Sequence, residues 1–71
     1  MNIYRVKRIN LSGIKTPEEY WQRVETAGIM YCVGVKALRE YCGGRLHKER
    51  AGYAGRNGDI EYVAEICGKN R

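Results

Sequence analysis

The sequence predicts a small α+β domain with an N-terminal strand, two helices and a C-terminal β-hairpin. The first observation is length: 71 residues are about half a typical domain, so we expect one unit spanning residues 1–71. The second is Thr16-Pro17-Glu18-Glu19, a helix-start signal. The third is Asn57-Gly58 between two segments rich in strand-forming residues, which indicates a tight turn.

The first strand is predicted over residues 3–9, which are rich in Ile, Val and Tyr. Neither of its faces is cleanly apolar, which favours an edge strand. The first helix is predicted from Pro17 to about Tyr31, because Thr16 is a good N-cap and proline fits the first helical position. Gly28 is an alternative, earlier end. One side of this helix is apolar and is expected to face the core: Tyr20, Trp21, Val24, Ala27, Gly28 and Tyr31.

A second, shorter helix is predicted over residues 35–42, ending at Gly43-Gly44. Lys36, Arg39 and Glu40 point away from its apolar side. A hairpin over residues 50–63 then follows, and a turn at Asn57-Gly58 places Tyr53 opposite Tyr62. A terminal helix is the alternative for residues 59–67, so strand and helix both stay open there.

The charge is positive and unevenly distributed. Thirteen Lys and Arg against eight Asp and Glu give a net charge of +5 and a pI near 9.3. Residues 32–58 alone hold six basic and two acidic residues, whereas residues 16–31 hold one basic and three acidic residues. A dense positive field on so small a surface favours a polyanionic partner.

Two helices joined by a glycine-containing turn and followed by a basic hairpin form the layout of a winged helix-turn-helix. In that layout helix 35–42 enters the major groove of double-stranded DNA, and hairpin 50–63 is the wing. The predicted DNA-binding residues are Lys36, Arg39, Arg45, Lys48, Arg50, Arg56 and Asn57. Of these, the cations at 45, 48 and 50 are expected to contact phosphates without reading sequence.

The stretch AGIMYCVGVKALRE, residues 27–40, resembles the helix-turn-helix of small excisionases from conjugative transposons and the MerR-like winged-helix group around them. The matching positions, within 14 of the 71 residues, are Ala27, Val33, Gly34, Leu38 and Arg39. The resemblance implies a recognition helix after Gly34, a wing after it, and a protein that binds and bends DNA to help a recombinase. The sequence therefore predicts a small DNA-binding protein, architectural or regulatory, of a mobile element or phage.

An inhibitor that binds a host defence protein, encoded by a phage or plasmid and without a DNA target of its own, is the alternative. We expect no enzyme and no cofactor, because so short a chain has little room for a substrate pocket. The chain has no apolar run of membrane-spanning length and no signal-peptide pattern, so we expect a cytoplasmic protein without a membrane partner. One module of this size would bind DNA weakly, which favours tandem or dimeric binding.

The cysteines are odd in number and widely spaced, which favours reduced thiols over a disulfide scaffold. Together with the one histidine they could form a Cys₃His zinc set: Cys32, Cys42, His47 and Cys67. The spacings of ten, five and twenty residues contain no Cys-x-x-Cys pair. Apolar packing is the simpler expectation for Cys32 and Cys42, and zinc binding stays open.

Overall fold

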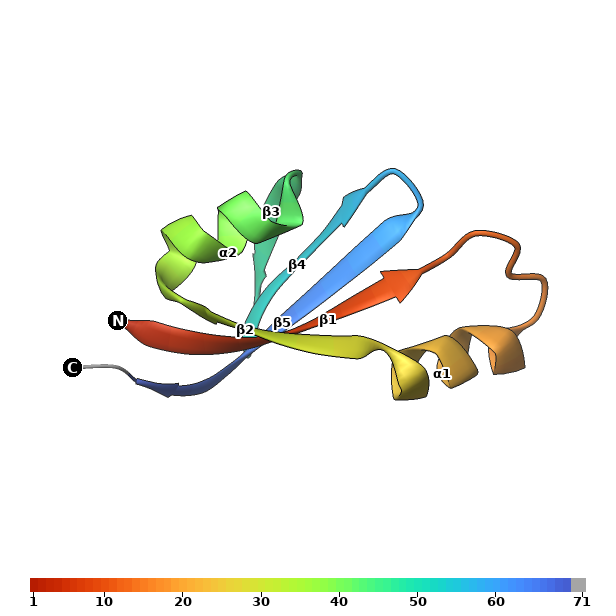
Figure 1. Cartoon of the computed structure of the whole chain (residues 1–71), viewed down its shortest axis with the longest axis horizontal. Helices are drawn as coiled ribbons and strands as arrows, with labels where there is room; N and C mark the ends of the chain where they lie inside the picture. The colour runs from red at the N-terminus through yellow and green to blue at the C-terminus, as the bar shows by residue number, and fades with distance from the viewer. Residues whose placement is uncertain (70–71) are drawn as a thin grey trace.

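The computed structural model describes residues 1–69, which form a five-stranded antiparallel sheet with two helices (Figure 1). In chain order the elements are β1 (Asn2–Asn10), α1 (Pro17–Thr26), β2 (Gly28–Val33), α2 (Gly34–Cys42), β3 (Arg45–Glu49), β4 (Gly52–Asn57) and β5 (Ile60–Lys69). Across the sheet the order is β2-β1-β5-β4-β3, so β2 and β3 are the edges. No helix within residues 1–69 has the length and apolar character needed to cross a membrane.

The predicted winged helix-turn-helix fold is wrong, because a strand separates the two helices. Residues 28–33, assigned from the sequence to the end of the first helix and the turn after it, pair with β1 from Arg8↔Gly28 to Ile3↔Val33. Ile29, Tyr31 and Val33 have side chains that suit a pleated strand. The chain leaves α1 at Ala27, whose φ of −63° and ψ of 139° are extended.

The start of α1 is confirmed. The Thr16 hydroxyl accepts a hydrogen bond from the Glu19 N–H at 3.3 Å, and the Glu19 carboxylate accepts one from the Lys15 N–H at 3.2 Å. Pro17 occupies the start of the helix, as predicted. These contacts lie within five residues of each other, which is why the local sequence predicts them.

Helix α2 covers one face of the sheet, which we call the α2 face, and forms the core there. Leu38 and Cys42 are the buried residues of the helix. The strands supply the rest of this cluster: Tyr4, Val6, Cys32, Tyr62 and Ala64. Tyr53 and Tyr41 pack against this cluster through edge-to-face ring contacts, Tyr53 with Tyr4 and Tyr41 with Tyr62.

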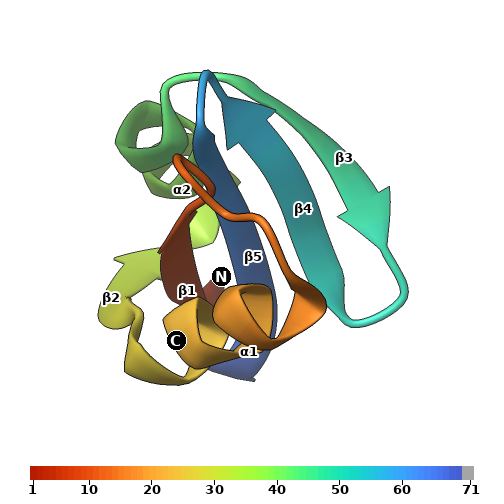
Figure 2. The ribbon, with the colours of Figure 1, turned by 90° about the vertical axis from the view of Figure 1, so that its right-hand side faces the viewer.

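The opposite side of the sheet, which we call the open face, carries Arg5, Lys7, Val63 and Glu65, by strand alternation from the core residues. Helix α1 packs only at one end of it, near Ile9, and Figure 2 shows α1 and α2 apart. The prediction that β1 is an edge strand is wrong, because β1 lies between β2 and β5. Arg5 and Lys7 are accommodated because the open face of this inner strand reaches solvent, and Arg8, on the other face, is also exposed.

Strands β4 and β5 form an antiparallel hairpin, and residues 60–69 are a strand, not the alternative helix. The predicted layout of a lone hairpin over residues 50–63 is wrong, because β3 pairs with β4 as a further strand. The register of the β4–β5 hairpin also differs from the prediction. Asn57 pairs with Ile60, so the two-residue loop is Gly58-Asp59, and Tyr62 lies opposite Gly55 while Tyr53 lies opposite Ala64. Gly58 has φ +62° and Asp59 does not have a positive φ, which is the requirement of a type II′ turn.

Candidate nucleic-acid interface

The outward side of α2 is cationic. Lys36, Arg39 and Glu40 are exposed and lie at helical spacing on the side away from Leu38 and Cys42. Among the described residues, neither Lys36 nor Arg39 forms an ion pair with a carboxylate. Both side chains therefore remain available to an external anion, in the outward position that the spacing predicts.

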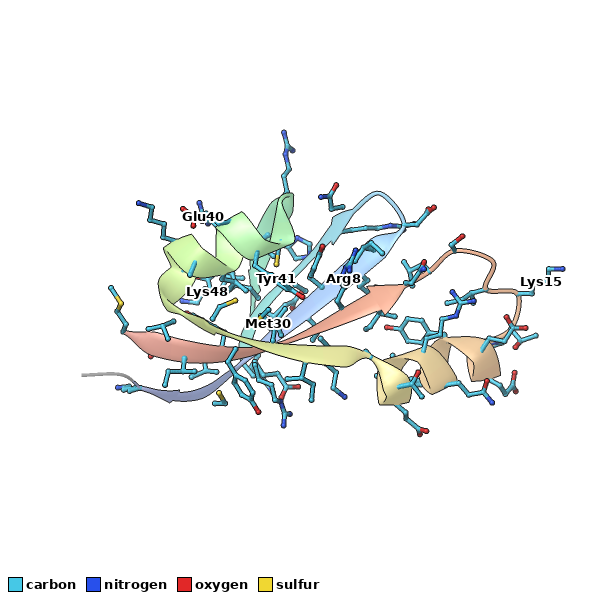
Figure 3. All side chains as sticks on the ribbon, viewed as in Figure 1. Arg8, Lys15, Met30, Glu40, Tyr41 and Lys48 are labelled. Atoms are coloured by element: carbon cyan, nitrogen blue, oxygen red, sulfur yellow. The ribbon has the colours of Figure 1, made fainter. Side chains whose placement is uncertain are left out.

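Two more cations lie on the same side of the sheet. Lys48 alternates with His47 and shares its side of β3 with Leu46, which packs against the core. Arg8 pairs with Tyr62 across β1 and β5, on the α2 face. Figure 3 shows Arg8 and Lys48 on the side of the sheet where α2 lies. We call Arg8, Lys36, Arg39 and Lys48 the α2-side cluster; Glu40 is the carboxylate beside it.

The structure does not gather all the predicted DNA-binding residues on one surface. Arg45 pairs with Arg56 across β3 and β4, and both side chains belong to the open face. The Arg56 Nε donates to the Gly58 carbonyl at 2.9 Å, so this arginine braces the hairpin turn. Arg50 is exposed in the turn between β3 and β4. Of the seven, only Lys36, Arg39 and Lys48 share the α2 side as exposed cations.

Asn57 has a structural contact that its sequence does not signal. Its Nδ2 donates to the Cys42 carbonyl at 3.3 Å, so the side chain ties the hairpin to the last turn of α2. The carbonyls in a last turn lack partners within the helix, and Asn57 satisfies one of them. The sequence does not single out Arg8 as a site residue, because its side of β1 becomes evident only from the strand pairing.

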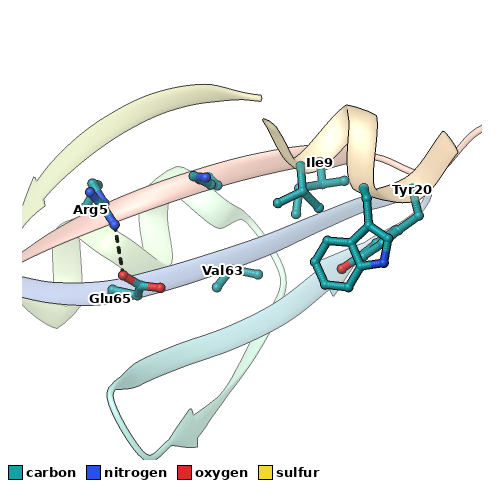
Figure 4. A pocket seen from close by; sticks show the side chains of 8 residues that line it. Arg5, Ile9, Tyr20, Val63 and Glu65 are labelled. Atoms are coloured by element: carbon teal, nitrogen blue, oxygen red, sulfur yellow. Dashed lines mark hydrogen bonds and ion pairs between the residues drawn. The ribbon is translucent and has the colours of Figure 1, made fainter. Parts of the chain in front are cut away.

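A hollow of about 220 Å³ lies between α1 and the open face (Figure 4). Its lining combines apolar, aromatic and charged side chains: Arg5, Lys7, Ile9, Tyr20, Trp21, Val24, Val63 and Glu65. Two of them, Arg5 and Glu65, are cross-strand neighbours on β1 and β5 and form an ion pair of 3.0 Å. Trp21 contacts Tyr20 edge-to-face with 5.3 Å between ring centroids and is 61% exposed, which corrects the expectation that it lies in the core.

Tyr20 links α1 to β5. Its hydroxyl donates to the Glu61 carboxylate at 2.6 Å. This hydrogen bond, followed by burial and by the charge of Glu61, raises the pKa of Tyr20 above its usual value. Glu61 is therefore engaged by α1, and the carboxylates of the open face at 61 and 65 both have partners.

The candidate zinc ligands lie in different environments. Cys32 and Cys42 are buried in the core, Cys67 is exposed, and His47 is exposed on the open face, 3.7 Å from Glu49. Burial, followed by the charge of Cys32, raises the pKa of Cys42 to about 11, and burial also raises the pKa of Cys32. Within residues 1–69 no three His, Cys, Asp or Glu side chains form a metal-binding group.

Comparison with known proteins gave no matching family model, no matching curated protein and no matching solved structure.

Proposed function

We propose that this chain is a small DNA-binding protein whose α2 side contacts the phosphate backbone of double-stranded DNA. The observation that carries the proposal is the difference in charge between the α2 side and the open face. The α2-side cluster has four cations beside one carboxylate, and these cations have no ion pairs among the described residues. The open face sets four cations (Arg5, Lys7, Arg45, Arg56) against three carboxylates (Glu49, Glu61, Glu65).

Unpaired, exposed cations are what phosphate binding needs. Each one that neutralises a phosphate releases condensed counterions, which drives association and makes it salt-dependent. Such contacts position a protein on the duplex without reading base sequence. A role for a mobile element or phage, and a recombinase partner, stay predictions from the sequence resemblance.

The alternative is an inhibitor that binds a host defence protein. The observation that favours it is the exposed apolar side of β2, where Ile29, Tyr31 and Val33 reach solvent. In this alternative the cations of the α2 side would meet an acidic protein surface. A pull-down from nuclease-treated host lysate separates the two functions, since a DNA-binding protein loses its nucleic-acid-mediated partners and an inhibitor keeps its target.

The direct test measures the affinity for a random-sequence duplex by fluorescence anisotropy over a range of salt concentrations. Lys36→Gln should weaken binding to every sequence and reduce the log–log salt slope by about 1 for each bound chain. Arg45→Gln is the matched control, because it also removes one positive charge but on the open face, and it should leave the slope unchanged. The proposal is overturned by no binding at low salt, or by equal losses in the two variants.

A further inference from the structure

Strand β2 is an open edge with apolar side chains. It pairs with β1 on one side, and no strand within residues 1–69 pairs with its other side, as Figure 2 also shows. Four of its residues, Ile29, Met30, Tyr31 and Val33, are between 41% and 61% exposed. The strand, GIMYCV, contains no Lys, Arg, Asp or Glu. An exposed, apolar edge of this kind offers backbone hydrogen-bonding groups and side-chain surface to another strand.

The other edge of the sheet is built differently. Strand β3 has the sequence RLHKE, and all of its residues except Leu46 are exposed. Charged side chains on an edge, lysine above all, are the means by which natural sheets prevent further pairing. The protein therefore blocks one edge and leaves the other open, so the apolar character of β2 is specific to that strand.

We propose that β2 pairs antiparallel with β2 of a second copy of this chain, to form one continuous sheet of five strands from each copy. A symmetric register with Tyr31 opposite its equivalent places Ile29 opposite Val33 on the open face. It places Met30 opposite Cys32 on the α2 face. Each of these cross-strand pairs is apolar, so the strand complements itself.

The pattern of the strand itself favours a second copy over an unrelated strand. Ile29, Tyr31 and Val33 lie on the open face, and Met30 and Cys32 lie on the α2 face. Because this apolar pattern is the same when the strand is read in either direction, pairing with a second copy gives apolar contacts on both faces at once. The contact is isologous, so each chain contributes the same residues to it.

The symmetry also sets where the two helices lie. In an antiparallel strand pair the two-fold axis is perpendicular to the sheet, so each face of one copy continues into the same face of the other. Both α2 helices then lie on one side, and the two α2-side clusters form one larger basic surface. This consequence for DNA rests on the proposed function, whereas the strand pairing does not.

The test of the pairing is the mass in solution by analytical ultracentrifugation. The wild type should sediment at twice the 8.2 kDa of the chain. Tyr31→Lys should sediment as a monomer with an unchanged circular dichroism spectrum, because Tyr31 is exposed in the single chain. Lys48→Glu on β3 is the control and should remain dimeric. A wild-type monomer at high concentration, or a dimer that survives Tyr31→Lys, overturns the proposal.

Crosslinking tests the register. Directly opposite residues of antiparallel strands have Cα atoms about 4.5–5.5 Å apart, within the range of about 4.4–6.8 Å for a disulfide. Tyr31→Cys, made with Cys67→Ser so that the exposed native thiol is removed, should form a covalent dimer on mild oxidation. Lys48→Cys in the same background should not. A chain that carries both Lys36→Gln and Tyr31→Cys should still form the covalent dimer although its DNA binding is weakened. Failure of the pairing and failure of the proposed function are therefore distinguishable.

Discussion

At the scale of single residues, burial separates the chemistry of the three cysteines. Cys42 is 1% exposed and its pKa is raised to about 11, whereas Cys67 is exposed. A higher pKa leaves less thiolate at any pH below it, so near pH 8 the thiolate fraction of Cys42 is about a hundredfold below that of a thiol with a pKa of 9.0. Cys42 therefore behaves as a small apolar core residue.

This difference predicts the reactivity of the thiols. With an aromatic disulfide reagent near pH 8, we expect one fast-reacting group per chain, which Cys67→Ser should remove. Cys32 and Cys42 should react only after denaturant is added. Rapid modification of Cys42 in the folded chain would show that the core under α2 opens far more easily than its packing indicates.

At the scale of elements, the sequence predicted what local contacts decide. The start of α1 depends on Thr16 and Glu19, three residues apart, and the outward placement of Lys36 and Arg39 depends on the spacing within one helix. The end of α1 is instead decided by residues 28–33 pairing with β1, twenty to thirty residues earlier in the chain. The apolar pattern of that stretch fits a helix side and an edge strand equally well.

The candidate site likewise has features that the local sequence predicts and features that depend on how the strands pair. That Arg45 and Lys48 lie on opposite sides of β3 follows from strand alternation, but the sequence does not state which side faces α2. The hairpin turn was predicted at Asn57-Gly58, whereas in the structure the turn residues are Gly58 and Asp59, and Tyr62 pairs with Gly55. Turn chemistry alone does not determine this register, because the packing of β5 against the rest of the fold also contributes.

Gly55 gives a prediction at this scale. A Cβ on Gly55 would collide with the Arg45 carbonyl oxygen and the Leu46 side chain of the neighbouring strand. We expect Gly55→Ala to lower the free energy of unfolding by about 1–3 kcal/mol, the usual cost of overpacking. Gly28→Ala is the control, since a Cβ there would meet no atom within 4 Å, and it should be nearly neutral. Urea denaturation of the two variants measures the difference, and similar losses would contradict the β3–β4 pairing.

At the scale of the whole molecule, charge and apolar surface are separated. The α2 side holds the unpaired cations, the open face holds partnered carboxylates, and the apolar edge of β2 joins the two sides along one border of the sheet. A polyanion and a second copy of the chain can therefore bind at the same time, because they use different surfaces. Affinity for DNA should then depend on protein association as well as on net charge.

Tyr31→Lys separates these two contributions, because it raises the net charge from +5 to +6 and also places a lysine on the open edge of β2. If net charge alone governed binding, this variant would bind duplex DNA more tightly than the wild type. We expect the opposite. A monomer presents one α2-side cluster of four cations and a dimer presents two, so the log–log salt slope should become shallower, from about −7 to about −3.6, with a loss of affinity.

The control is Arg45→Gln, which lowers the net charge to +4 without changing β2 or the α2 side and should retain the steeper slope. Anisotropy titrations over the same salt range measure both slopes, and a tighter complex for Tyr31→Lys would show that association through β2 contributes nothing to DNA binding.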